Sequence, residues 1–326
     1  MSADSVEILV TGGAGFIGSN VVNLLTQTQK VVVVDRMGYM SRVGNWERPE
    51  NVIHAEIDIN NKLGVLRLLQ QYQIRYILHF AAQTHVCNSF DNVSLFIRDN
   101  VKGTNSLLEV CREYGKIVKF VHVSTDEVYG EVPFDQVDGC KESDALHPTN
   151  PYAATKAAAE HIATSYMKSY GIPVVITRGN NVYGPYQYPE KVIPKFAVQL
   201  LTGKPLTIHG AGTAKRHFCY VEDVAKAFVT VLEKGVPGEI YNIGTETDEY
   251  SVVEVGEKLS KLIQPDTTMI TTTVEDRKFN DCRYHIDCSK MRELGWVATT
   301  SFDEGLARTV EFYRRHLTEY AMYLTK

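Results

Sequence analysis

The sequence contains few cysteines, and none of them is spaced as a metal-binding or redox pair. Six cysteines are spread over 326 residues without a Cys-x-x-Cys motif. This scatter is typical of reduced thiols in small core positions, and it favours a cytoplasmic location. A chain of this length can bury a large core, so stability requires neither a disulfide nor a metal ion, and we expect no metal site.

An excess of positive charge is also absent. The chain has 34 lysines and arginines against 39 aspartates and glutamates, which gives a net charge of −5. A protein that binds nucleic acid through a broad basic surface has the opposite balance. We therefore expect no nucleic-acid partner, and an anionic ligand must be bound by a few local basic residues.

Long apolar runs are missing as well. Apolar residues make up 44% of the chain and charged residues 22%, as in ordinary soluble proteins. No apolar run approaches the about 18 residues of a membrane-spanning helix, and no signal-peptide pattern precedes the first strand. The sequence therefore predicts a soluble protein without a membrane partner.

Glycine, in contrast, forms a regular pattern near the N-terminus. Residues 7–10 are typical of a strand, and Gly12, Gly15 and Gly18 follow at the start of a helical pattern. In a dinucleotide-binding turn, such glycines permit the tight turn, the approach of a pyrophosphate and close packing of helix on strand, in that order. The pyrophosphate would lie at the helix N-terminus, where N–H groups and the helix dipole favour anions.

Two further strands end in carboxylates. A strand over residues 30–34 leads into Asp35, and one over residues 52–59 contains Asp58 near its end. A carboxylate at the end of the second strand accepts hydrogen bonds from the adenosine ribose and repels a 2′-phosphate. This predicts NAD in preference to NADP, although Arg36 could tolerate the phosphate, and a plain βαβ unit is the alternative. Asp58 is a candidate contact for the adenine amino group.

Strands and helices alternate through the first half of the chain. Helical patterns over 62–71 and 93–114 flank a strand at 76–80, whose tip carries the small residues Ala81 and Ala82. Small side chains there let a cofactor lie against the backbone. The alternation predicts a parallel, doubly wound sheet.

We therefore predict an α/β protein with two parts. Residues 1–178 would form a Rossmann-type NAD-binding domain, to which later segments return. Residues 179–326 would form a smaller α/β domain for the substrate.

The stretch 118–130 combines a buried strand with chemically useful side chains. Its apolar, β-branched first half is followed by Ser124, Thr125, Asp126 and Glu127. Ligands of open α/β sheets bind outside the carboxyl ends of the strands, so these side chains would face a ligand. Adjacent carboxylates repel each other and are costly to bury, which favours a function over a polar turn that merely ends a strand.

A second pair of candidates lies on the helix that follows a loop at 131–149. Tyr152 and Lys156 are four residues apart and therefore share one helix face. An ammonium group beside a phenol lowers the phenol pKa, so we expect Tyr152 to act as a proton acceptor.

Basic residues recur in the second half of the chain. In an acidic protein they could form a diphosphate site, because arginine binds phosphate with two parallel hydrogen bonds. About half of them, Lys204 among them, fit solvated surface charges instead. The residues are Lys191, Lys195, Lys204, Lys215, Arg216, Arg277 and Arg283.

These motifs together resemble the extended short-chain dehydrogenase/reductases. Among these, the chain is similar to the nucleotide-sugar 4,6-dehydratases, of which dTDP-glucose 4,6-dehydratase is the best known. The resemblance covers nearly the whole chain. It rests on Thr-Gly-Gly-Ala-Gly-Phe-Ile-Gly at 11–18, His-Phe-Ala-Ala at 79–82, Ser-Thr-Asp-Glu-Val-Tyr-Gly at 124–130, Asn-Pro-Tyr-Ala-Ala-Thr-Lys at 150–156, Tyr-Gly-Pro-Tyr-Gln-Tyr-Pro-Glu-Lys at 183–191 and Tyr-Asn-Ile-Gly at 241–244.

The resemblance implies a role for each motif residue. The catalytic residues would be Thr125, Asp126, Glu127, Tyr152 and Lys156. The contacts to NAD would be Gly12, Gly15, Phe16, Ile17, Gly18, Asp35, Asp58, Ile59, Ala81, Ala82, Asn100, Ser124, Tyr152 and Lys156. The contacts to the substrate would be Thr84, Asn181, Lys191, Arg216, Asn242 and Arg277.

The implied reaction is the NAD-dependent dehydration of a nucleoside-diphosphate glucose to its 4-keto-6-deoxy derivative, a step toward rhamnose-type sugars. Related epimerases and decarboxylases share the glycines and the Tyr-x-x-x-Lys pair but generally lack the adjacent acid and base. They remain the nearest alternative, and a non-catalytic NAD-binding regulator is a more distant one. Departures from the family pattern at 85–87, 216–218 and 276–281 leave the nucleotide, dTDP or UDP, open.

A homodimer is also expected from the resemblance. Related enzymes pair two helices of each subunit into a four-helix bundle, and the corresponding helices here are at about 93–114 and 151–170. They carry apolar residues on more than one face, for example Leu107, Leu108, Ile162 and Tyr166.

Overall fold

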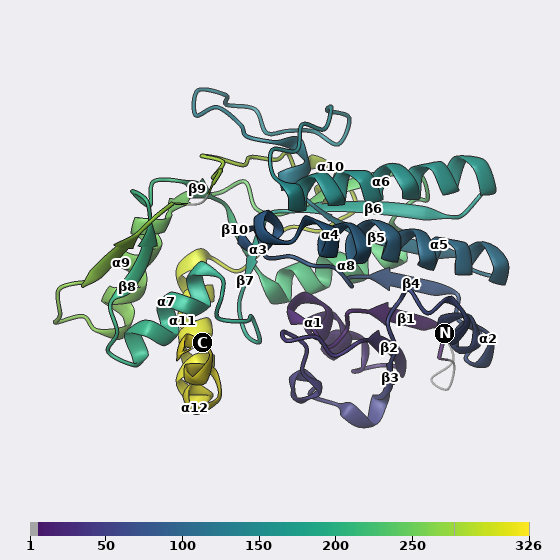
Figure 1. Cartoon of the computed structure of the whole chain (residues 1–326), viewed down its shortest axis with the longest axis horizontal. Coiled ribbons are helices and arrows are strands. Elements are labelled where there is room, and N and C mark those ends of the chain that lie inside the picture. The colour runs from purple at the N-terminus through teal and green to yellow at the C-terminus, as the bar shows by residue number, and fades with distance from the viewer. Residues whose placement is uncertain (1–5, 277, 326) are drawn as a thin grey trace.

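A seven-stranded parallel sheet forms the centre of the larger lobe (Figure 1). The computed structural model describes residues 6–276 and 278–325. The strand order across the sheet is β11-β6-β5-β4-β1-β2-β3, which confirms the predicted Rossmann-type fold. The strands are β1 (Ile8–Thr11), β2 (Val31–Asp35), β3 (Val52–Glu56), β4 (Tyr76–His79), β5 (Lys119–Thr125), β6 (Val174–Gly179) and β11 (Ile240–Ile243).

The direction of winding reverses between β1 and β4. The chain builds outward from β1 to β3, then returns to place β4 on the other side of β1. At such a reversal the connections leave the sheet on opposite faces and open a crevice at the carboxyl ends of the strands. The last strand, β11, pairs with β6 although it follows the sheet's other strands by some 60 residues.

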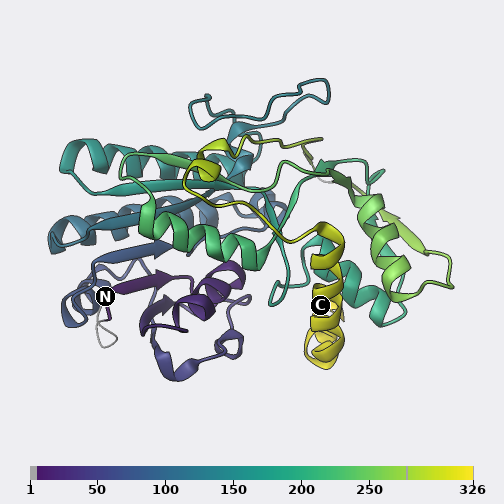
Figure 2. The same ribbon diagram turned by 180° about the vertical axis from the view of Figure 1, so that it is seen from behind.

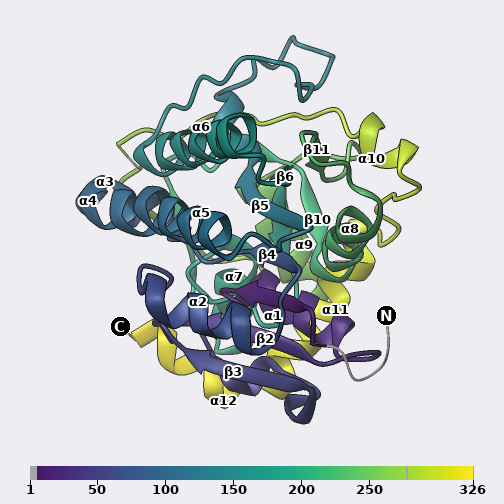
Figure 3. The same cartoon turned by 90° about the vertical axis from the view of Figure 1, so that its right-hand side faces the viewer.

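One face of the sheet is covered by α2 (Lys62–Gln71), α5 (Gly103–Tyr114) and α6 (Pro151–Tyr170), as the side view shows (Figure 3). The predicted helix over 93–114 is interrupted. It begins as α4 (Val93–Phe96), continues as one π-helical segment at Ile97–Lys102 and then becomes α5.

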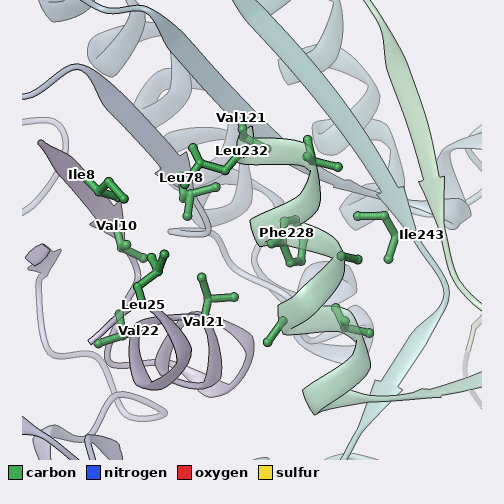
Figure 4. Packing of buried hydrophobic residues seen from close by; sticks show 14 of the residues in the cluster. Ile8, Val10, Val21, Val22, Leu25, Leu78, Val121, Phe228, Leu232 and Ile243 are labelled. Atoms are coloured by element: carbon green, nitrogen blue, oxygen red, sulfur yellow. The ribbon is translucent and has the colours of Figure 1, made fainter. Parts of the chain in front are cut away.

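The opposite face is covered by α1 (Phe16–Leu25) and α8 (Val221–Lys234), which lie side by side (Figure 2). Val21 and Val22 of α1 pack with Phe228 of α8 against the valines and leucines of the sheet (Figure 4). The strands read as near-continuous apolar runs because both of their faces are buried.

The smaller lobe contains the later helices and three short strand pairs. The pairs are β7 (Asn181–Tyr183) with β10 (Phe218–Tyr220), β9 (Lys215–Arg216) with β12 (Tyr250–Ser251), and β8 (Leu206–His209) with β13 (Thr271–Val274). The helices are α7 (Val192–Leu201), α9 (Val252–Ile263), α11 (Phe302–Arg315) and α12 (Leu317–Ala321). The remaining short elements include α3 (Val86–Asp91), α10 (Ser289–Glu293) and 3₁₀ turns at Val43–Asn45, Pro49–Asn51 and Met322–Thr325.

Two details differ from the sequence predictions. Strand β3 ends at Glu56, so Asp58 follows the strand instead of belonging to it. Leu107 and Leu108, which we expected at a subunit contact, have no exposed surface because they pack in the core beneath α5. Within the described residues, no helix is both long and apolar enough to span a membrane.

Candidate active site

A cavity of about 920 Å³ opens at the carboxyl ends of β1, β4 and β5 and extends into the smaller lobe. Most of the residues selected from the sequence line it. They are Gly12, Gly15, Phe16, Ile17, Gly18, Asp35, Asp58, Ile59, Ala81, Ala82, Thr84, Ser124, Thr125, Asp126, Glu127, Tyr152, Lys156, Asn181, Lys191 and Arg216.

The glycine turn leaves no room for side chains. Gly12 has φ +69°, and a Cβ there would lie 2.7 Å from the backbone nitrogen of Ala81. A Cβ on Gly18 would lie 2.3 Å from the carbonyl oxygen of Gly12. Helix α1 begins after Gly15 without a side-chain cap, so the N–H groups of its first turn are left for an anion.

The carboxylate of Asp35 is anchored at the end of β2. It accepts hydrogen bonds from the backbone N–H groups of Ala14, at 3.1 Å, and Met37, at 2.9 Å. Its neighbour Arg36 donates two hydrogen bonds to Asp99, at 2.8 and 2.5 Å, and its guanidinium lies 3.5 Å from Asp58. Arg36 is therefore committed to carboxylates, which disfavours its use for a 2′-phosphate.

Asn100 has a different position from the one the resemblance implies. Its side chain is buried outside the cavity, where Oδ1 accepts from the backbone N–H of Gln83 at 2.7 Å. Its Nδ2 donates to the carbonyl of Gln83 and to the hydroxyl of Thr155. Asn100 thus holds the segment after β4 against α6. This geometry disfavours a direct contact between Asn100 and the cofactor.

At the end of β5, Ser124 carries a polar atom without a partner. Its buried hydroxyl makes no hydrogen bond within the described part of the chain, although the residue lines the cavity. An unpaired buried hydroxyl is costly, so this position favours a bound ligand that pairs with it.

Asp126 and Glu127 follow in a 3₁₀ turn at Asp126–Tyr129. Asp126 Oδ2 accepts a hydrogen bond from Nδ2 of Asn180 at 3.1 Å, and Glu127 Oε2 accepts one from Nδ2 of Asn150 at 3.1 Å. Burial, and then the charge of Glu127, raise the pKa of Asp126 to about 7. Burial also raises the pKa of Glu127, but Lys191 opposes this shift. Asn180 and Arg216 oppose the shift at Asp126 in the same way, so burial favours a proton on both carboxyls, and the negative charge of Glu127 adds to this effect at Asp126.

Tyr152 and Lys156 both face the cavity from α6, but the expected effect of the lysine on the phenol is wrong. Burial and the charge of Glu127 raise the pKa of Tyr152, and only the hydrogen bond from Thr125 lowers it. Lys156 instead donates from Nζ to the carbonyl of Val123 at 2.5 Å. Burial lowers the pKa of Lys156 to about 8.

The residues expected at the substrate separate into three groups. Lys191 donates to the carbonyl of Thr84 at 2.9 Å and both line the cavity, as does Asn181. Arg216 donates to the carbonyl of Asp281 at 2.7 Å and lies over the ring of Tyr284. Arg277 lies outside the described residues.

Asn242 is not among the residues that line the cavity, so the structure does not support the expected contact with the substrate. Its fully buried side chain accepts a hydrogen bond from the hydroxyl of Tyr129 at 2.8 Å. It also donates to the carbonyls of Cys140 and Asp287. All of these side-chain hydrogen bonds are to other protein groups. Asn242 therefore holds the loop after β5 in place.

Four lining residues were not found from the sequence. Asn180 and Asn150 orient the two carboxylates, as described above. The hydroxyl of Tyr284 lies 2.5 Å from Oδ2 of Asp281 and 3.5 Å from Oε2 of Glu127. Asn150 begins the motif at 150–156 and Asp281 ends the stretch at 276–281, but the sequence assigned neither of them a role, and nothing in the sequence pointed to Asn180 or Tyr284.

Comparison with known proteins gives a consistent result. The family described as GDP-mannose 4,6 dehydratase matches residues 9–309. The mouse dTDP-D-glucose 4,6-dehydratase is 44% identical over 95% of this chain and 89% of its own. A trifunctional UDP-glucose 4,6-dehydratase, epimerase and reductase from Arabidopsis thaliana is 49% identical over 94% of this chain, but this chain spans only 47% of that protein.

Solved structures agree with the sequence comparison. The dTDP-glucose 4,6-dehydratase of Streptomyces venezuelae, crystallised with NAD, superposes with a TM-score of 0.91 at 37% identity, covering 97% of this chain and 99% of its own. A UDP-glucose 4-epimerase from Thermotoga maritima has a TM-score of 0.88 at 33% identity, covering 96% and 100%.

The sheet, the glycine turn and the Tyr152/Lys156 pair define an extended short-chain dehydrogenase/reductase. With the matches above, the chain belongs to the family of the nucleotide-sugar 4,6-dehydratases.

Proposed function

We propose that the protein is an NAD-dependent 4,6-dehydratase that converts UDP-glucose or dTDP-glucose to the 4-keto-6-deoxy sugar nucleotide. One observation carries this proposal. Two adjacent carboxyl groups, Asp126 and Glu127, line the same cavity as Tyr152, and burial raises the pKa of both, so that one can hold a proton while its neighbour is ionised. Elimination of water needs an acid and a base in addition to Tyr152, whereas epimerisation at C4 does not need this second pair.

The cavity fits NAD. The turn at Gly12, which has no side chain, would admit the pyrophosphate, Asp35 at the end of β2 would accept hydrogen bonds from a ribose, and the unpaired hydroxyl of Ser124 would pair with the cofactor. When bound, NAD supplies the hydride acceptor for C4 and later the hydride donor for C6. We propose that the region before residue 179 holds this cofactor, and that the smaller lobe holds the nucleotide sugar.

In the oxidation step, Tyr152 accepts the proton of the C4 hydroxyl. Thr125 lines the cavity beside Tyr152 and lowers the pKa of its phenol, and we propose that its hydroxyl also holds the C4 oxygen. Because burial raises the pKa of Tyr152, the phenol can accept this proton only after it has given up its own. We propose that Lys156, whose pKa burial lowers to about 8, takes the phenol proton in its neutral form and passes it to solvent.

In the elimination step, the new C4 ketone acidifies the proton at C5. Glu127 removes that proton, because Lys191 and the amide of Asn150 favour its ionised form. Asp126 retains its proton up to about pH 7 and donates it to the C6 hydroxyl, which leaves as water.

The test is product analysis with UDP-glucose and dTDP-glucose in separate incubations. We expect mass loss of one water and a 4-keto-6-deoxy product from at least one of them. A sugar of unchanged mass with inverted C4 would support an epimerase instead, and NAD binding without turnover would support a regulator. A third incubation, with a nucleoside-diphosphate uronic acid, tests for a decarboxylase, which would release carbon dioxide.

We further propose a homodimer in a reducing cytoplasm. Val93, Ile97 and Tyr170, on α4, the π-helical segment and the end of α6, are between 41% and 54% exposed. They form a better candidate surface than the buried leucines of α5. All six cysteines are free thiols, as a reducing compartment requires. A monomer by light scattering at micromolar concentration would contradict the dimer.

A further inference from the structure

Two histidines and a glutamate meet outside the cavity, although they lie far apart in the sequence. His217 lies between β9 and β10, Glu249 precedes β12, and His285 lies in the segment before α10. Nε2 of His217 is 3.0 Å from Nδ1 of His285 and 3.1 Å from Oε1 of Glu249. One ligand atom from each residue falls within 4.8 Å of the other two.

The outer nitrogen of each ring points to a backbone carbonyl. Nδ1 of His217 is 2.7 Å from the oxygen of Thr247, and Nε2 of His285 is 3.2 Å from the oxygen of Val137. A carbonyl can only accept, so each of these nitrogens carries the proton of its neutral ring. The two nitrogens that face each other are then both lone pairs, and the third neighbour, Glu249, is an acceptor too.

Arg283 already supplies a positive charge to Oε1 of Glu249, but the two facing lone-pair nitrogens still repel each other unless a proton or a metal ion lies between them. The arrangement also has the features of a metal site, in which the non-ligating nitrogen of a histidine donates to a carbonyl and so fixes the ring. Two imidazoles and a carboxylate are a common donor set for Zn²⁺. Zinc bonds of about 2.0–2.1 Å place tetrahedral ligands roughly 3.3 Å apart, close to the two distances from Nε2 of His217, while the third pair of ligand atoms lies within 4.8 Å.

We propose that His217, Glu249 and His285 bind a zinc ion, with water as the fourth ligand. His217 is buried, whereas Glu249 and His285 are partly exposed, so solvent reaches the site from one side. Arg283 donates from Nε to Glu249 at 2.6 Å and holds the carboxylate in place, as hydrogen-bonded neighbours of metal ligands commonly do.

The site would be structural, because it joins segments that position the substrate end of the cavity. His217 follows Arg216 directly, and His285 follows Tyr284, whose ring lies beneath the guanidinium of Arg216. The backbones of Lys215 and Arg283 form an isolated parallel β-bridge between the same two segments. A zinc ion would therefore fasten the contact between Arg216 and Tyr284 without touching the reacting atoms.

The experiment measures bound metal, so its outcome does not depend on the proposed reaction. The purified protein is dialysed against zinc, freed of excess metal and analysed by mass spectrometry for zinc content. We expect near-stoichiometric zinc in the native protein and in His147→Ala, which removes an exposed histidine elsewhere. His217→Ala, His285→Ala and Glu249→Gln should each lose most of it.

Two further readouts cover variants that fold poorly. Cobalt added to the native protein should give the visible absorption bands of a tetrahedral site, and chelation should lower the melting temperature. In an active preparation, chelation should raise KM for the nucleotide sugar more than it lowers kcat. Native protein that retains no more zinc than His217→Ala, and gives no cobalt bands, would overturn the proposal and assign the space between the rings to a shared proton.

Discussion

Asn150 links the start of α6 to the carboxylate of Glu127. Its Oδ1 accepts from the backbone N–H of Ala153 and caps the helix, while its Nδ2 donates to Oε2 of Glu127 at 3.1 Å. One side chain therefore fixes the position of α6, which carries Tyr152, relative to Glu127, the proposed base.

This link predicts two separable effects of substitution. Asn150→Ala removes the cap and the hydrogen bond, so the free energy of unfolding should fall by about 1 kcal/mol and turnover should fall as well. Asn150→Ser keeps a capping oxygen but cannot reach Glu127 with an amide. We expect native-like thermal stability with reduced kcat for this variant; equal kcat in Asn150→Ser and the native protein would refute the orienting role.

The raised pKa of Asp126 predicts a pH dependence. This carboxyl must be protonated to act as the acid, and burial with the charge of Glu127 keeps it so up to about pH 7. Product formation should therefore decline as the pH rises through about 7. The reduction of bound NAD by the substrate, followed by stopped flow, does not use Asp126 and should show no loss with that pKa. A parallel decline of both rates would contradict the assignment.

The phenol of Tyr152 is the proposed proton acceptor of the first step. Tyr152→Phe keeps the ring in its buried site, so folding and NAD binding should survive. Turnover should fall by roughly 10²- to 10⁴-fold, the usual contribution of a positioned acid or base. Steady-state kinetics with an NAD-binding titration as control decides this, and near-native turnover would exclude the role.

Cofactor choice depends on the pair of Arg36 and Asp99. Because Asp99 occupies the guanidinium with two hydrogen bonds, the native protein should bind NAD more tightly than NADP. Asp99→Asn weakens that pair and should raise the affinity for NADP relative to NAD. Calorimetry on the native protein and the variant measures both ratios. A native preference for NADP would show that Arg36 is free to bind a phosphate.

Features that are local in the chain could be predicted from the sequence. Gly12, Gly15 and Gly18 lie close together in the chain, so their spacing alone indicated the cofactor-binding turn. Asp126 and Glu127 are adjacent, which indicated the acid–base pair. The alternation of strands and helices predicted the parallel sheet for the same reason.

Features that depend on distant contacts could not be predicted. Whether an asparagine faces the cavity or the interior is decided by its partners, and Asn242 faces Tyr129 from over 100 residues away. The pKa of Tyr152 depends on how deeply α6 buries it and on Glu127, not on the spacing to Lys156.

The central claim is that Asp126 and Glu127 perform an elimination that follows oxidation at C4. Asp126→Asn and Glu127→Gln keep size and polarity but remove the acid and the base. Each variant is mixed with UDP-glucose or dTDP-glucose, and the absorbance of reduced NAD is followed together with the sugar product. The account predicts that reduced NAD appears and persists, while the 4-keto-6-deoxy product forms roughly 10²-fold more slowly or less. Product formation at the native rate in both variants would contradict the account, and would leave the two carboxyls as a polar end of β5.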